Sequence, residues 1–114
     1  MIKYNLDLLK EQCGNEKAFF NEMLDIFIRS SLEGVANMEE ALAGNDMKTL
    51  GHYAHKIISP CKHIEADSLV NSLREIEHKA EKSGFSKERA GELVGIVKND
   101  VIELTEALKK EYIQ

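Results

Sequence analysis

The chain has 114 residues, enough for one folded domain whose hydrophobic core needs no disulfide or metal staples. Hydrophobic residues make up 43% of it and charged residues 31%, a balance that excludes a wholly disordered chain. The chain has seven Gly and one Pro, together about 7% of its residues, whereas these two residues make up roughly 12% of an average protein. So few turn-forming residues cannot supply the many turns of a small sandwich or barrel. We therefore expect an all-α protein with a single domain over residues 1–114.

The charge excludes further classes of protein. Fifteen Lys and Arg residues stand against 20 Asp and Glu, so the net charge is −5 and no positive field covers the chain for binding nucleic acid. The first residues lack the apolar core of a signal peptide, and no run approaches the roughly 20 apolar residues of a membrane span. Cys13 and Cys61 form neither a disulfide framework nor a paired metal motif. We expect a cytoplasmic protein that does not insert into a membrane.

The first half of the chain predicts two helices. A short one covers residues 5–13 and ends at Gly14. Asn15 is the predicted N-cap of the second, with Glu16 in the first turn, where the helix dipole favours a negative charge. Residues 19–28 are apolar on more than one side of this helix, which predicts extensive burial, and Ser30, Ser31 and Gly34 predict a bend or break.

The second half predicts three more helices. Gly44 ends the preceding helix and Asp46 caps the third, which runs over residues 47–64. The fourth covers residues 67–83, and Ser86 caps a long last helix whose apolar residues repeat at helical spacing. Short loops between long amphipathic helices are typical of antiparallel neighbours, so we expect an up-down four-helix bundle with a short N-terminal capping helix.

The third helix carries the candidate site. Its core side is Leu50, Ala54, Ile57 and Cys61, whereas His55 lies on the outward face with Lys48, Gly51, His52, Ser59 and Lys62. Residues seven apart lie within about 20° of each other around a helix, so Lys48 and Lys62 line up with His55. The residues one turn away, Gly51 and Ser59, are small. We therefore expect an exposed imidazole that is open on both sides.

This arrangement suits the carriage of a phosphoryl group. A neutral imidazole is a competent nucleophile near pH 7, and lysines would stabilise the negative charge that a phosphoryl group brings. Side chains on a helix lean toward its N-terminus, so Lys62 reaches back toward His55 and is the expected charge partner, with Lys56 on the flank as a second. The alternative interpretation of the same residues is a solvated helix surface.

A metal site is the other chemistry that the histidines raise. Glu75 and His78 form a Glu-x-x-His unit, which di-iron bundles use twice together with two further glutamates. The chain has no second unit, and His78 lies off the apolar stripe of its helix. We therefore expect no metal bound by this protein, and stoichiometric iron or zinc in the purified protein would revive that alternative.

The sequence around His55 resembles a known family. The segments that carry the resemblance are Ala54-His55-Lys56-Ile57-Ile58, Ser59-Pro60-Cys61, residues 64–69 and Leu73-Arg74-Glu75-Ile76-Glu77. Together they are similar to a histidine-containing phosphotransfer domain, over nearly the whole chain. The resemblance implies that His55, through Nε2, accepts a phosphoryl group from a receiver-domain aspartyl phosphate and passes it to another receiver aspartate.

The resemblance also implies the partners. They are a receiver (response regulator) domain and a hybrid sensor histidine kinase. The chain could itself be part of such a membrane-associated kinase. Lys48, Gly51, His52 and Ser59 are expected to contact the receiver, whose acidic pocket a locally basic face would attract. Mg²⁺ is expected from the receiver, and no cofactor from this domain. Because no Gly-rich phosphate loop is present, we expect a phosphocarrier without kinase activity. We also expect it to be a monomer.

The chain departs from the family at three positions. Members commonly have Lys three residues after the histidine and Gly four after it, where this chain has Ile58 and Ser59. Lys62 or Lys56 is therefore expected to replace the missing lysine. Pro60 removes a helical hydrogen bond at a typical cost of about 3 kcal/mol, and we expect a kinked but continuous helix. Ile58 and Pro60 keep open an alternative function, a helical adaptor that binds a receiver or partner helix without being phosphorylated.

Overall fold

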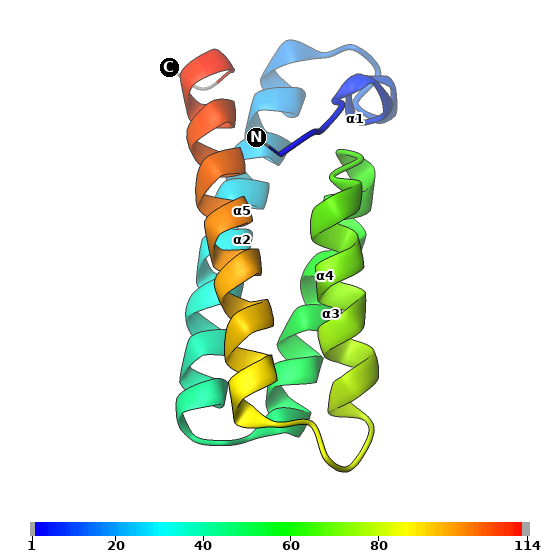
Figure 1. Ribbon diagram of the computed structural model, residues 1–114. Coiled ribbons are helices and arrows are strands. Elements are labelled where there is room, and N and C mark those ends of the chain that lie inside the picture. Colours follow the sequence, from blue (N-terminus) through cyan, green and yellow to red (C-terminus); the bar gives the residue numbers. More distant parts are fainter. Residues whose placement is uncertain (1, 113–114) are drawn as a thin grey trace.

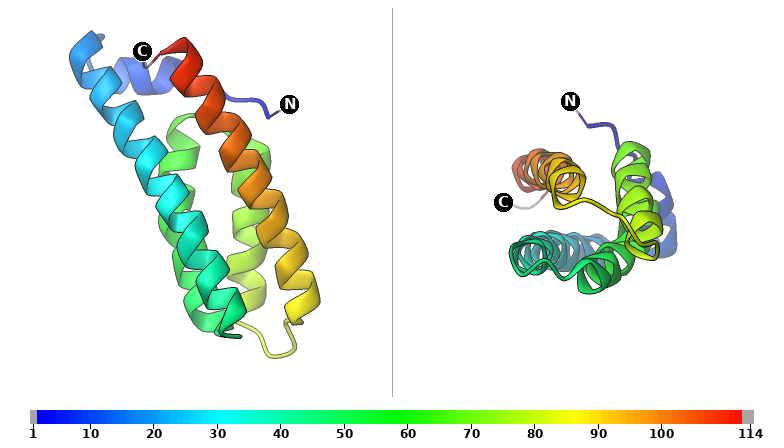
Figure 2. Two further views of the ribbon diagram at one scale, coloured as in Figure 1. Left: turned by 90° about the vertical axis from the view of Figure 1, so that its left-hand side faces the viewer. Right: turned by 60° about the horizontal axis from the view of Figure 1, so that its bottom comes forward.

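The computed structural model describes residues 2–112, and these residues form five helices and no strand. The helices are α1 (Asp7–Gln12), α2 (Lys17–Ala43), α3 (Met47–His63), α4 (Asp67–Ala80) and α5 (Lys87–Glu111). Helices α2 to α5 run alternately up and down, and α1 lies across one end (Figure 1). The near-end-on view of Figure 2 shows the four long helices around one core. The predicted all-α bundle with an N-terminal capping helix is therefore confirmed.

Two of the three predicted N-caps form. The Asp46 side chain accepts a hydrogen bond from the Thr49 backbone N–H at 3.1 Å, and Ser86 accepts one from the Arg89 N–H at 3.1 Å. The predicted cap at Asn15 is wrong, because Asn15 has φ of 60° and belongs to the left-handed turn that ends α1. Helix α2 instead has Glu16 at its N-cap, without a side-chain hydrogen bond.

Helix α2 is one continuous helix, so the predicted break at Ser30–Gly34 is wrong. The Ser31 hydroxyl donates to the carbonyl of Phe27, and a Cβ on Gly34 would lie 3.1 Å from Cγ2 of Ile57 in α3. These small residues therefore allow α3 to approach closely. The prediction of burial on several sides also fails at Phe19 and Ile26, which remain 43% and 41% exposed, because no neighbouring helix covers that edge.

The core runs the length of the bundle between the four long helices. Its most buried members are aliphatic and come from all four: Leu24, Met38, Leu50, Leu69, Leu73, Ile76, Val97, Val101, Leu104 and Leu108. Burying each such side chain stabilises the fold by about 1.5–3 kcal/mol before the entropy cost of ordering it. Helix α4 ends at Ala80, three residues earlier than predicted, and α3 continues through Pro60 as predicted.

Helix α1 fixes the C-terminal end of α3. Leu6 and Leu9 are buried in the bundle end, and the Asn5 N–H donates to the carbonyl of Ile64 at 2.8 Å. His63 Nδ1 lies 2.8 Å from Gln12 Oε1. The half of α3 that follows His55 is therefore held by the N-terminal segment as well as by the neighbouring long helices.

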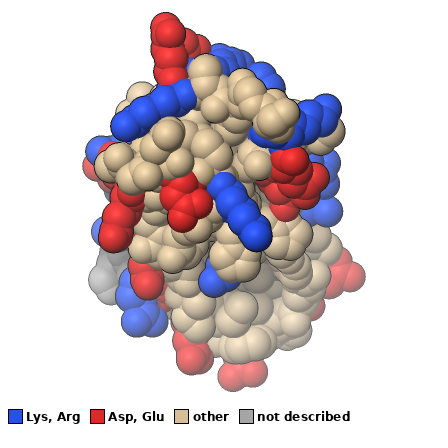
Figure 3. Space-filling view, turned by 90° about the horizontal axis from the view of Figure 1, so that it is seen from below, with Lys and Arg blue, Asp and Glu red and all other residues tan. Residues whose placement is uncertain are grey.

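The surface carries charges of both signs. Seen from the end that holds the α2–α3 and α4–α5 connections, Lys and Arg side chains are interspersed with Asp and Glu (Figure 3). The sequence of α3 is locally basic, with three lysines and three histidines but no acidic residue. None of the helices described over residues 2–112 is long and apolar enough to span a membrane.

Candidate functional site

Helix α3 places His55 on the outward face that the sequence predicts. The His55 side chain is 69% exposed, whereas Leu50, Ala54 and Cys61 are completely buried on the opposite side. Burial raises the pKa of the Cys61 thiol to about 12, so this group stays protonated and is neither a nucleophile nor a metal ligand. Of His55 and Cys61, His55 is therefore the side chain that solvent and a partner can reach.

A glutamate from the neighbouring helix contacts the His55 ring. Glu77 of α4 places its Oε2 against His55 Nδ1, and the Glu77 side chain is only 30% exposed. Because a carboxylate accepts hydrogen bonds, this contact puts the ring proton on Nδ1 and leaves the lone pair of Nε2 directed away from α4. The pair therefore has the orientation that a nucleophilic Nε2 requires.

Sequence reasoning missed Glu77. It follows Ile76, which is completely buried, and thus lies at the edge of the apolar stripe of α4. That position at the border of the core was the available signal. This signal does not identify the residue of α3 that Glu77 contacts, because that residue depends on the axial offset between α3 and α4.

The close approach of α3 and α4 begins one turn before His55. An added Cβ on Gly51 would lie 2.5 Å from Cβ of Ala80, so the two helices touch backbone to side chain at this point. Gly51 is buried, and the expectation that it leaves one side of His55 open is wrong, since α4 covers that side. The lack of a side chain at Gly51 instead allows Glu77 to reach His55.

A shallow pocket of about 500 Å³ surrounds this contact. Its walls come from α3 and α4 and comprise Lys48, Gly51, His52, His55, Glu77, Ala80 and Glu81. Of the predicted site residues, the structure thus brings Lys48, Gly51 and His52 to the same pocket as His55. Lys48 supplies the cation of this pocket, where two carboxylates are also present.

The other predicted residues lie outside this pocket. The ammonium of Lys56 is 5.6 Å from the ring centroid of Tyr53, within the range of a cation–π interaction. Lys56 thus contacts Tyr53 and does not line the pocket of His55. Lys62 is exposed two turns after His55. Ser59 is exposed one turn after His55 and lines a different pocket.

That second pocket, which we call the apolar notch, lies beside Pro60. It has a volume of about 210 Å³ and is lined by residues of α1, α2 and the end of α3: Leu9, Met23, Ile26, Phe27, Ser30, Ser59, Pro60, His63 and Ile64. Exposed Phe19 lies one turn before Met23 on α2. An exposed apolar surface of this kind is typical of a protein-binding region, and it begins one helical turn from His55.

The structure gives Glu75 a role outside metal binding. Its Oε2 lies 2.9 Å from Lys79 Nζ and 3.0 Å from Arg89 Nη2, so Glu75 joins α4 to α5. Hydrogen bonds from these two cations hold the pKa of the Glu75 carboxyl below its usual value. Over residues 2–112 no three His, Cys, Asp or Glu side chains are arranged to hold a metal ion.

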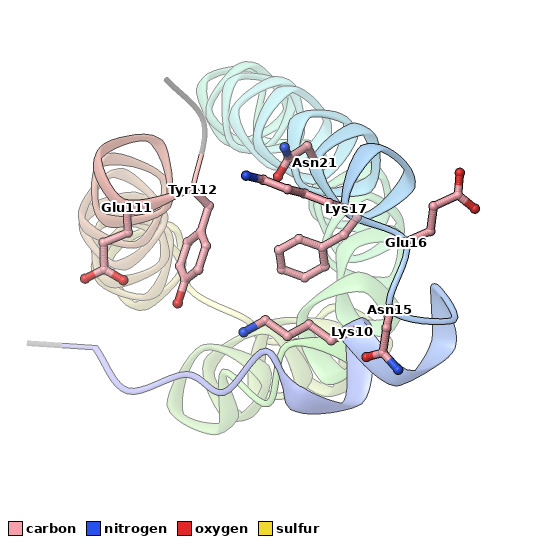
Figure 4. Close-up of a pocket in the computed structure, with 8 residues that line it drawn as sticks. Lys10, Asn15, Glu16, Lys17, Asn21, Glu111 and Tyr112 are labelled. Carbon is pink, nitrogen blue, oxygen red and sulfur yellow. The ribbon is translucent and has the colours of Figure 1, made fainter.

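A wider pocket of about 740 Å³ opens at the α1 end of the bundle (Figure 4). Lys10 of α1 places its ammonium 5.8 Å from the ring centroids of both Phe20 and Tyr112, which pack edge to face at 6.0 Å. Phe20 lies 14 residues before Gly34, which packs against Ile57, so the pocket is about 20 Å along the helices from the His55 level. Lys10 thus joins α1 to α2 and α5, far from His55.

Comparisons with known proteins identify relatives of this fold. The Hpt domain family matches residues 22–110. Histidine-containing phosphotransfer protein B (HptB) from Pseudomonas aeruginosa PAO1 is similar in structure, with a TM-score of 0.84 and 21% sequence identity; the match covers 96% of this chain and 93% of that one. At this identity the likeness shows the fold. Among the curated proteins, none matches the sequence significantly.

Proposed function

Since the chain belongs to the Hpt domain family and has a phosphotransfer role in two-component signalling, we propose that His55 is its phosphorylated residue. His55 accepts the phosphoryl group from a receiver-domain aspartyl phosphate and passes it to the aspartate of another receiver. The observation that supports this assignment best is the contact of Glu77 with His55 Nδ1, which leaves Nε2 free on an exposed face.

The contact between Glu77 and His55 suggests where charge and protons go during phosphoryl transfer. The lone pair of Nε2 attacks phosphorus, the bond from phosphorus to the aspartate oxygen breaks, and the receiver aspartate leaves as a carboxylate. The ring then carries a positive charge and keeps its proton on Nδ1, where the Glu77 carboxylate stabilises it. When a second receiver aspartate attacks phosphorus, the same retained proton allows the imidazole to leave as a neutral group.

Cations on α3 would offset the charge of the phosphoryl group. Lys48 shares the pocket of His55, and Lys62 leans back along the helix toward it. Lys56 could contribute only by leaving the ring of Tyr53. The residues of this chain bind and orient the phosphoryl group, whereas Mg²⁺ and most of the transition-state stabilisation would come from the receiver. The domain is thus a phosphocarrier and not a kinase.

Response regulators are the partners that the family implies. A receiver docked over His55 would contact His52 and Lys48 on one side and Ser59 on the other, with the apolar notch extending the contact surface. The basic side of α3 complements the acidic pocket in which a receiver holds Mg²⁺ and its aspartyl phosphate. The donor in this scheme is the receiver of a hybrid sensor kinase, and the domain acts as a monomer.

The test is transfer from a phosphorylated receiver to the purified protein. Wild type should acquire a label that is acid-labile and stable in base, and His55→Gln should acquire none. His78→Gln is the matched control, because His78 is exposed on α4 away from the pocket of His55. Absence of label on wild type, or equal label on His55→Gln, would contradict the proposal.

The apolar notch favours a second candidate, an adaptor that binds a receiver or partner helix without phosphorylation. Its distinguishing result is that His55→Gln binds an unphosphorylated receiver as tightly as wild type does while no phosphoryl group is ever transferred. Isothermal titration of both proteins, run beside the transfer assay, separates the two functions.

A further inference from the structure

Ser59 lies where its hydroxyl can face a group carried by His55. It follows His55 by four residues, so the Cβ atoms of the two are about 5–6 Å apart on the surface of α3. Because Cα–Cβ bonds on a helix tilt toward the N-terminus, the Ser59 side chain leans toward His55. Ser59 is exposed, so no neighbouring helix intervenes.

The Ser59 hydroxyl has no partner among the described residues. Serine in a helix commonly donates to the carbonyl four residues before it, as Ser31 does to Phe27 and Ser72 does to Ser68 at 3.3 Å. Ser59 makes no such bond to the carbonyl of His55, nor to any other group of residues 2–112. Its proton is therefore available to an incoming acceptor.

Ser59 lies on the side of His55 that faces away from α4. On α3, Gly51 lies about 40° from His55 in one direction and Ser59 about 40° in the other, because each is four residues away. Gly51 contacts Ala80 of α4, so Gly51 lies on the side of α3 that faces α4. Nδ1 of His55 contacts Glu77 of α4, so Nε2 is the ring nitrogen that Glu77 leaves free, and Ser59 lies on the side of α3 away from α4.

A phosphoryl group on Nε2 would need a donor there. It brings three acceptor oxygens and about two negative charges next to the Glu77 carboxylate, while Ile58, the residue between Ile57 and Ser59, is apolar and buried. We propose that the Ser59 hydroxyl donates a hydrogen bond to a phosphoryl oxygen of phosphorylated His55, so that Ser59 is a positioning residue of this site. The inference rests on His55 being the phosphorylated residue.

The experiment loads the phosphoryl group chemically, so that it does not depend on a receiver. With phosphoramidate, Nε2 attacks phosphorus, the phosphorus–nitrogen bond breaks and ammonia leaves. Wild type, Ser59→Ala, Ser59→Thr and the control Ser72→Ala are loaded, and the decay of phosphohistidine and its ³¹P chemical shift are followed by NMR. His55→Gln identifies any signal from the other histidines.

Ser59→Ala should lose its phosphoryl group about three- to tenfold faster than wild type, with a shifted ³¹P signal, because a charge-assisted hydrogen bond is lost. Ser59→Thr, which keeps the hydroxyl, and Ser72→Ala should match wild type. Equal decay in Ser59→Ala and wild type, or equal acceleration in Ser59→Ala and Ser59→Thr, would overturn the role of the hydroxyl.

The same experiment separates this inference from the proposed function. Loading of His55 with wild-type behaviour in Ser59→Ala removes the role of Ser59 and leaves the phosphocarrier intact. Loading of His55 with a clear Ser59 effect but no exchange with any receiver keeps the hydrogen bond and contradicts the relay. If the signal of wild type persists unchanged in His55→Gln, both are wrong.

Discussion

Gly51 and Ala80 lie so close that a Cβ on Gly51 would be 2.5 Å from the Cβ of Ala80, one helical turn before His55 meets Glu77. Real Cβ atoms do not approach to this distance, so the two positions together determine the separation of α3 and α4. That separation is what lets a glutamate on one helix reach a histidine on the other. The contact between Gly51 and Ala80, whose side chains carry no reactive group, thus positions His55 against Glu77.

Gly51→Ala should push α3 and α4 apart. The new methyl group meets a rigid Cβ, so the backbone must move, with an expected destabilisation of about 1–3 kcal/mol and slower phosphoryl transfer. Urea denaturation and the transfer rate measure the two effects. Ala80→Gly in the same protein should restore transfer. Gly95→Ala is the control, because a Cβ there has nothing within 4 Å; an equal loss in that variant would show that helix packing at Gly51 is not the cause.

Glu77→Gln should slow transfer while leaving the fold intact. The amide oxygen can still accept the Nδ1 proton, but it cannot stabilise the positive ring, so we expect a rate about tenfold lower. Glu77→Ala should be slower still, since it also frees the ring. The measurement is single-turnover transfer from a phosphorylated receiver. Glu81→Gln, at the edge of the same pocket, should have the smaller effect, and the reverse order would argue against Glu77 as the partner of His55.

Pro60→Ala should stabilise the protein. The substitution restores an N–H to the helical hydrogen bond with the carbonyl of Lys56 and removes the clash of the proline ring, so the free energy of unfolding should rise by about 1–3 kcal/mol. The same change alters the wall of the apolar notch and should weaken receiver binding. Urea denaturation and isothermal titration test these effects, and an unchanged or lower midpoint would contradict the first.

The ion pairs of Glu75 should make part of the stability dependent on pH. Lys79 and Arg89 lower the pKa of Glu75 from its ordinary 4.5, so their contribution is fully present above that value and is lost as the pH falls through the lowered pKa. Glu75→Gln should therefore be less stable than wild type at pH 7, and the difference should shrink as the pH falls below 4.5 and through the lowered pKa of Glu75. Thermal denaturation across this range measures it, with exposed Glu106→Gln as the control. A difference that stays constant with pH would contradict the linkage.

Local chemistry was sufficient to predict most of the fold. The caps at Asp46 and Ser86 depend on residues within the same turn, and the outward position of His55 follows from the apolar period of its own helix. The predicted cap at Asn15 failed because Asn is favoured both at an N-cap and in the left-handed turn that follows a helix, and the sequence pattern alone does not distinguish these positions. Phe19 and Ile26 were misplaced because the apolar pattern of α2 does not say which edges its neighbours will cover.

Five helical segments, and an outward position for His55 on a basic helix face, could thus be predicted from the chain alone. Both follow from the spacing of apolar residues and from the charges within one segment. Three features required the packed structure: Glu77 meets His55, Gly51 is buried against Ala80, and Lys48 rather than Lys56 lines the pocket of His55. Each of these depends on the rotation and axial offset of two packed helices. The rotation and the offset are set by how the side chains of two helices interlock. The apolar spacing within a single helix carries no information about that packing.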